Sequence, residues 1–189
     1  MSLICGCPVE DFITSIVVDN CPSSFGQVQK VIFQRQIDDT TTPGTPVANT
    51  MTQAAAELLA TWTPLLSDTK GKKVTSSPFI ENPETEVGAI REFGGGNQTL
   101  GGRPIVLGSN ATQFTGVINQ SPQSTILEMK DLMCEKLAVY LISEEGKIAG
   151  DEHTSGNLKG FDVYALWVGD KNLGGFDEPD SNGISFWMP

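Results

Sequence analysis

The sequence predicts a mainly β protein, a β-sandwich or small barrel flanked by one or two short α-helices and long loops. Three observations support this fold class. Gly, Pro, Ser, Thr and Asn supply 71 of the 189 residues, a composition that suits strands and turns better than helices. Charged residues make up 19% of the chain, below the roughly 25% that is usual for soluble domains. Short apolar runs rich in Val, Ile and Phe alternate with turn clusters.

The length predicts a single domain spanning residues 1–189, with an N-terminal arm of about residues 1–12 and a long loop at 38–49. The predicted strands, in order, are residues 13–18, 28–37, 72–80, 103–107, 112–118, 137–143, 161–168 and 184–188.

Two of these strands have a predicted position in the sheet. Pro78 cannot donate a ladder hydrogen bond, so residues 72–80 are expected at an edge. Residues 161–168 are apolar on both faces, so we expect a central strand in which Trp167 is buried.

Two helices are predicted. Residues 52–61 are rich in Ala and Leu, Thr50 and Gln53 fit a capping box, and Pro64 is expected to end the helix. Residues 125–136 form the second helix, because apolar residues recur there with helical spacing. These are Ile126, Met129, Leu132 and Met133.

The glycine-rich run 93–102 is predicted to be a flexible loop tip rather than a phosphate-binding loop. A dinucleotide-binding loop opens a helix, but Pro104 and a predicted strand follow here, and no Gly-Lys-Ser/Thr is present. His153 lies in a polar stretch bounded by glycines and is expected to be a solvated loop residue.

The charge excludes two classes of partner. Twelve Lys and Arg against 23 Asp and Glu give a net charge of −11 and a pI near 4.4, so the chain repels nucleic acid and anionic membrane surfaces. No apolar run approaches the roughly 18 residues of a membrane span. Residues 128–189 alone hold 12 acidic and 5 basic residues, a net charge of −7.

The sequence predicts no catalytic residue, no cofactor and no metal, and therefore not an enzyme. A single histidine excludes sites that need two imidazoles. Glu178, Asp180 and Asn182 match ligand positions of a calcium loop, but Pro189 stands where a bidentate glutamate is required, so an Asx-type turn is expected. For the four cysteines we favour free thiols, with a metal site or a disulfide as alternatives; they are Cys5, Cys7, Cys21 and Cys134.

The order of several segments resembles that of structural proteins of tailed bacteriophages and prophages, most closely the tail-tube class. The segments are residues 25–33, 61–72, 93–102, the helix 125–136 and the strands 137–143 and 161–168. The resemblance covers most of the chain through element order rather than through a specific motif. The cysteine-bearing start and the end at Pro189 depart from the pattern, which keeps other phage head or tail proteins as an alternative.

The resemblance implies a non-enzymatic subunit that stacks as rings, usually hexameric, into a tube whose acidic lumen lets DNA pass without specific binding. Its partners would be further copies of itself and other virion proteins. It would be located in the virion after synthesis in the host bacterial cytoplasm.

Two groups of residues are the site candidates. The acidic lumen candidates are Asp151, Glu152, Asp177, Glu178 and Asp180. The candidates for an assembly interface are Thr40, Thr41, Thr42, Pro43, Gly44, Trp187 and Met188.

A ligand- or carbohydrate-binding β-sandwich is the alternative from another class, with Trp62, Trp167 and Trp187 as stacking platforms. Burial of Trp167, as expected above, would weaken that alternative. A third hypothesis is an acid-dependent hydrolase that uses Glu178 and Asp180.

Overall fold

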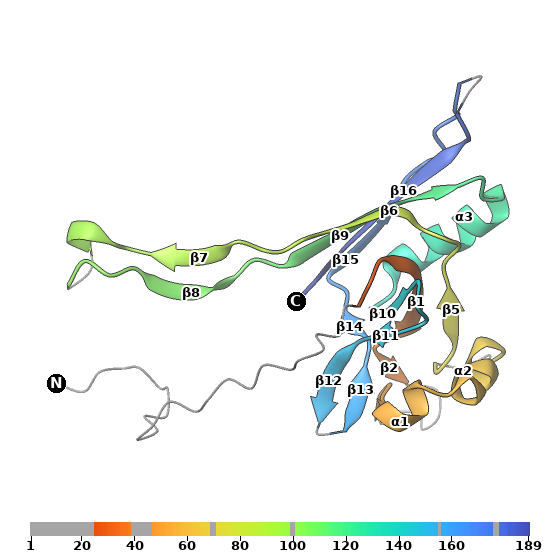
Figure 1. Cartoon of the computed structure of the whole chain (residues 1–189), viewed down its shortest axis with the longest axis horizontal. Coiled ribbons are helices and arrows are strands. Elements are labelled where there is room, and N and C mark those ends of the chain that lie inside the picture. Colours follow the sequence, from red (N-terminus) through yellow and green to blue (C-terminus); the bar gives the residue numbers. More distant parts are fainter. Residues whose placement is uncertain (1–24, 39–46, 69–70, 99–100, 155, 176–177) are drawn as a thin grey trace.

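β10 (Leu137–Ser143), expected as a buried strand, lies at the centre of the computed structural model (Figure 1). It pairs antiparallel with β1 (Val28–Arg35) on one side, and with β11 (Ile148–Ala149) and β14 (Phe161–Asp162) on the other. β5 (Val74–Ser76) pairs with β1 and ends this central sheet, so the predicted edge position is confirmed. The structure describes residues 25–38, 47–68, 71–98, 101–154, 156–175 and 178–189.

The central sheet is buried on both faces, which explains why β1 and β10 are apolar at consecutive positions. Val31, Phe33 and Val139 belong to one hydrophobic cluster, whereas Ile32 and Tyr140 belong to a second cluster on the opposite face. Each cluster is covered by a different layer of the fold.

A second sheet covers the first cluster and makes the body a β-sandwich. It consists of β15 (Ala165–Val168), β16 (Ser181–Met188), β9 (Thr112–Asn119) and β6 (Glu81–Glu86), in that order. We call it the β9–β16 sheet, because β9 and β16 pair over eight registered positions. Phe114 and Phe186 stack in the core with ring centroids 4.7 Å apart. The mainly β fold class predicted from the sequence is therefore confirmed.

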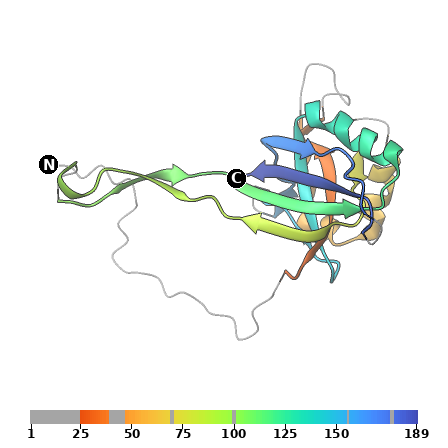
Figure 2. The ribbon, with the colours of Figure 1, turned by 90° about the horizontal axis from the view of Figure 1, so that it is seen from above.

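α3 (Gln123–Asp131) and the 3₁₀ turn η2 (Leu132–Cys134) close one end of the sandwich. Ile126 and Met129 reach the first cluster from α3, as their spacing predicted. Figure 2 shows α3 alongside the two sheets.

The second cluster is covered by the short helices α1 (Gln53–Ala56) and α2 (Leu59–Leu66). Trp62 of α2 packs edge-on against Tyr140, with ring centroids 5.1 Å apart, and its indole donates a hydrogen bond to the Ala56 carbonyl (2.8 Å). Short strands surround these helices. They are β2 (Ile37–Asp38), β3 (Val47–Ala48), β4 (Met51–Thr52), β12 (Asp151–Thr154) and β13 (Asn157–Lys159).

The single helix predicted at residues 52–61 is wrong in its extent. The chain breaks between α1 and α2, and the cap is Thr52 rather than Thr50, because the Thr52 hydroxyl accepts a hydrogen bond from the Ala55 amide (3.2 Å). Pro64 lies inside α2 instead of ending the helix.

The single central strand predicted at residues 161–168 is also wrong. β14 joins the central sheet, whereas β15 crosses to the edge of the β9–β16 sheet. Trp167 consequently points outward and is 51% exposed. His153 is exposed as expected, but it lies in β12 rather than in a loop.

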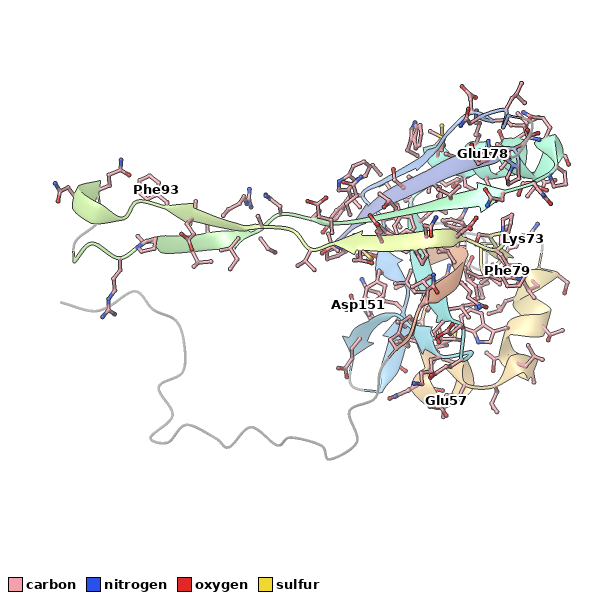
Figure 3. The ribbon with its side chains drawn as sticks, turned by 45° about the horizontal axis from the view of Figure 1, so that its top comes forward. Glu57, Lys73, Phe79, Phe93, Asp151 and Glu178 are labelled. Atoms are coloured by element: carbon pink, nitrogen blue, oxygen red, sulfur yellow. The ribbon has the colours of Figure 1, made fainter. Side chains whose placement is uncertain are left out.

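β7 (Ile90–Phe93) and β8 (Ile105–Ser109) form a separate two-stranded hairpin, which continues β6 and β9 away from the body. We call residues 87–110 the arm. Figures 1 to 3 agree that the arm stands clear of both sheets. The 3₁₀ turn η1 (Gly96–Gln98) lies near its tip, so the predicted loop tip is part of a long projection.

Several predicted features lie outside the described residues. They are the N-terminal arm, the strand 13–18, Cys5, Cys7, Cys21, the residues 40–44 and Asp177. Among the described helices, we find none that is long and apolar enough to cross a bilayer.

Candidate assembly surfaces

The arm exposes an unusual amount of apolar side chain. Six large hydrophobic residues along it are between 54% and 78% exposed. They are Val87, Ile90, Phe93, Ile105, Val106 and Leu107. Exposed apolar surface of this extent marks an interaction site, and an isolated two-stranded hairpin is marginally stable in water. The arm is therefore the first candidate surface.

The base of the arm is fixed by a close approach of its two chains. The Asn110 amide donates a hydrogen bond to the Ala89 carbonyl (3.0 Å). At Gly88, a Cβ atom would lie 1.9 Å from the Asn110 carbonyl oxygen, so only glycine fits there. The arm consequently leaves the body in a defined direction.

The arm also differs from the body in charge. Arg91, Arg103 and Glu92 give residues 87–110 a net charge of +1. Because the whole chain has a net charge of −11, the remaining residues sum to −12. The arm is thus opposite in net charge to the rest of the chain.

The outward face of the β9–β16 sheet is the second candidate surface. Its register aligns two rows of outward side chains across the four strands. One row is Glu86, Gln113, Trp187 and Ala165. The other row is Glu84, Thr115, Ser185 and Trp167. Each row begins with a carboxylate at β6, and no lysine or arginine belongs to either row.

Trp167 lies flat on this face because two glycines leave space for its ring. Cβ atoms placed on Gly169 and Gly183 would lie 2.7 Å and 3.2 Å from the indole. Trp167 nevertheless stays 51% exposed. The half-buried Trp187 lies on the neighbouring strand, so the two tryptophans share the outward face.

The structure separates the predicted lumen candidates instead of gathering them. Asp151 and Glu152 lie in β12, whereas Glu178 and Asp180 lie in the connection between β15 and β16, at the other end of the body (Figure 3). Asp151 faces Lys159 (3.7 Å) and Asp180 faces Lys171 (3.2 Å), so part of their charge is neutralised. The carboxylates that do align are Glu84 and Glu86 of β6. The sequence does not predict them as a row, because the charged residues and Pro83 of β6 do not indicate a strand.

Of the predicted interface residues, the described ones differ in accessibility. Trp187 lies on the outward face, but Met188 is buried in the first cluster. Because β16 alternates sides, these two neighbours necessarily point in opposite directions.

The titratable groups with shifted pKa values have structural causes. Burial raises the pKa of Tyr140 to about 12. The hydrogen bond that Lys159 donates to Asp162 (2.9 Å) raises the lysine pKa, and Lys130 lowers the pKa of the exposed Asp170. Within the described ranges, no group of three His, Cys, Asp or Glu residues could hold a metal ion, and Cys134 is an exposed free thiol.

Comparison of the sequence with known protein families and with characterised proteins finds no match.

Proposed function

We propose that this protein is a non-enzymatic virion structural subunit, similar to a tail-tube protein, that self-assembles into stacked rings. The rings, usually hexameric in the tail-tube class, would form an acidic conduit through which DNA passes without specific binding. The single observation that carries this proposal is the apolar arm, because a projection with this much exposed apolar surface needs a protein partner to cover it.

A second copy of the chain is the partner that fits best. Residues 87–110 sum to +1 and the rest of the chain to −12, so the arm of one copy is attracted to another copy. Because the arm and the surface that receives it are different parts of the chain, the contact is head-to-tail, and such contacts generate closed rings or open filaments.

The outward face of the β9–β16 sheet supports the conduit. Glu84 and Glu86 present negative charge there without a basic neighbour in their rows. A surface of this kind repels the phosphates of DNA and does not retain the duplex.

The test of self-assembly is removal of the arm. Residues 90–109 are replaced by an Asn-Gly turn, because the turn is then flanked by Ala89 and Asn110, which lie opposite each other in the register that joins β6 to β9. We expect the full chain to form rings or tubes with a central channel in negative-stain images, and the armless chain to be monomeric by sedimentation with an unchanged circular dichroism spectrum. A full chain that stays monomeric at high concentration and in all salts would contradict the proposal.

A matched pair of variants tests the apolar character of the arm. Ile90→Ser with Phe93→Ser removes apolar surface, whereas Asn97→Ser with Gln98→Ser changes polar residues near the tip. Assembly should be lost in the first variant and retained in the second. Equal assembly of both would show that the apolar side chains are not the contact.

A carbohydrate-binding module is a second candidate, favoured by the exposed ring of Trp167 beside Trp187. Tryptophan rings stack on the apolar faces of sugars, and the half-buried Gln113, which pairs with Trp187, supplies a polar group nearby. Titration with a glycan panel should then shift the fluorescence of the wild type but not of Trp167→Ala. No shift with any glycan would remove this candidate.

A further inference from the structure

The two faces of the arm carry different residues, and the pairing register assigns them. Directly opposed residues of an antiparallel pair share a face. Glu92 pairs with Val106, and Ile90 lies on the same side of β7 two residues earlier. We call this the Ile90 face.

The opposite face is built from the alternate positions. Phe93 pairs with Ile105, and Arg91 pairs with Gly108. The pairing shifts between Arg91 and Glu92, where β8 has one extra residue, so the alternation along β7 is kept. We call this the Phe93 face.

Both faces are apolar and exposed to the same extent. On the Ile90 face, Ile90 and Val106 are 64% and 62% exposed, and on the Phe93 face, Phe93 and Ile105 are 57% and 54% exposed. A hairpin that lies on one surface is expected to have one apolar face, which is covered, and one polar face, which is solvated, as half-buried sheets do. This arm does not have that pattern.

We propose that the arm of one copy inserts between two other copies, so that each of its faces is covered by a different chain. This inference rests on the proposed self-assembly and specifies its geometry. Two arms stacked on each other would each leave one apolar face exposed to water. The body of the same chain does not cover the arm, because the arm stands clear of it.

The charges indicate that the two covering surfaces are not the same. Arg91 lies on the Phe93 face and Glu92 on the Ile90 face, so β7 contributes charges of opposite sign to the two faces. The Phe93 face fits an acidic surface, and the Ile90 face fits a surface that offers a base. Two neighbouring copies in a ring present different sides to the space between them, and this arrangement supplies two unlike surfaces.

A three-chain contact has a kinetic consequence. An arm finds its complete site only where two copies are already neighbours, so a ring or part of a ring must precede stacking. Assembly should therefore show a lag that shortens when preformed particles are added.

The test uses a photoreactive residue on each face of the full-length chain. Three variants are compared: Ile90→p-benzoylphenylalanine, Phe93→p-benzoylphenylalanine and the chain with both. In particles verified by negative stain, each single variant should give a two-chain product on irradiation, and the double variant should also give a three-chain product. Peptide mapping should place the two attachment sites on different segments of the body. The same variants irradiated as dilute monomers are the control and should give no product between chains.

Three results separate the explanations. A product from only one face shows that the arm lies on a single surface and overturns the inference while leaving self-assembly intact. Products attached to residues 87–110 show arms paired with each other and overturn it as well. A wild-type chain that forms no particles overturns both the proposed function and this inference.

Footprinting of the unmodified chain keeps the inference testable if the photoreactive residue blocks assembly. Hydroxyl-radical oxidation of Ile90, Val106, Phe93 and Ile105 should fall several-fold in particles relative to monomer at all four positions. Protection limited to one pair would overturn the inference, and Leu59 on α2, 78% exposed, serves as the reference position in the same digest.

Discussion

Gly88 and Asn110 meet at the base of the arm so closely that a Cβ atom on Gly88 would lie 1.9 Å from the Asn110 carbonyl oxygen. The obstacle is backbone rather than a flexible side chain, so the two chains must separate to admit any other residue. A substitution at Gly88 is therefore expected to change the direction in which the arm leaves the body.

Gly88→Ala should therefore displace the arm and reduce assembly. Forcing a methyl group against backbone costs about 1–3 kcal/mol in a packed site, and here the cost falls on the pairing at the arm base. The measurement is the midpoint concentration of assembly by light scattering. Gly175→Ala is the matched control, because a Cβ atom there meets nothing within 4 Å. Equal midpoints for both variants would contradict the prediction.

Trp62 and Trp167 should differ strongly in what they contribute to stability. Trp62 is 5% exposed, packs on Tyr140 and donates to the Ala56 carbonyl, so Trp62→Ala should lower the free energy of unfolding by about 3–5 kcal/mol. Trp167→Ala removes a ring from the surface and should cost about 1 kcal/mol or less. Urea unfolding of the two variants, compared with wild type, provides the values. A larger loss from Trp167 would show that its ring supports the sheet.

The buried Tyr140 should make the fold sensitive to strong alkali. Burial raises its folded pKa from 10.0 to about 12, so the neutral form is favoured in the folded state. The resulting stability is complete below pH 10 and is lost between pH 10 and pH 12, because the unfolded chain releases its proton first. Each pKa unit is worth about 1.4 kcal/mol, which gives a loss of about 2–3 kcal/mol across that range.

Tyrosinate absorbance against pH, together with unfolding midpoints, measures this effect. The chain holds one other tyrosine, the 66% exposed Tyr164, so Tyr164→Phe isolates the absorbance of Tyr140. Tyr140→Phe should lose the corresponding part of the alkaline destabilisation. If Tyr140 ionises near pH 10 while the chain is still folded, its burial does not control its charge.

Charge reversal should locate the surface that faces the conduit. Glu84→Lys with Glu86→Lys changes the outward face of the β9–β16 sheet, and we expect assembled particles of this variant to retain DNA in a salt-dependent way. Glu152→Lys with Glu178→Lys makes the same change in net charge at two exposed, separated positions. Filter binding at several salt concentrations compares them. DNA retained by the second variant alone would place the conduit at β12 or at the β15–β16 connection instead.

Added salt should strengthen assembly if like charges from several copies converge on a common channel. Repulsion between them acts over about 8–10 Å at physiological ionic strength, and salt screens it. Sedimentation at increasing sodium chloride concentrations measures the effect on the wild type. A steady weakening with salt would indicate that attraction between the arm and the acidic body dominates instead.

The central sheet and the helix α3 could be predicted from the sequence because their patterns are local. Leu137–Ser143 is a continuous apolar run, and Ile126 and Met129 repeat with helical spacing. The split of residues 161–168 between two sheets could not be predicted, since an apolar alternation fits either sheet equally well. Only the pairing of β15 with β16 decides that Trp167 faces solvent.

The arm could not be predicted from the sequence. The glycine-rich tip is predicted as a loop tip, but β6 is Glu-Asn-Pro-Glu-Thr-Glu, a sequence of low strand propensity. It pairs because the neighbouring β9 supplies a ladder. β7 is Ile-Arg-Glu-Phe, in which apolar and charged residues do not alternate, and it has no buried face. Without those two strands, the sequence predicts a loop at the glycine run rather than the end of a projection.

The continuity of the arm with β6 and β9 also determines how the fold responds to mechanical load. β9 is joined to β16 along eight registered pairs, with all ladder bonds perpendicular to the strands. A force applied along a docked arm acts parallel to β9 and loads these bonds in shear, many at once, whereas a force across the sheet would peel them one by one. Rupture along the arm axis therefore requires many bonds to fail together, and single-molecule pulling from the tip should meet its highest resistance in that direction.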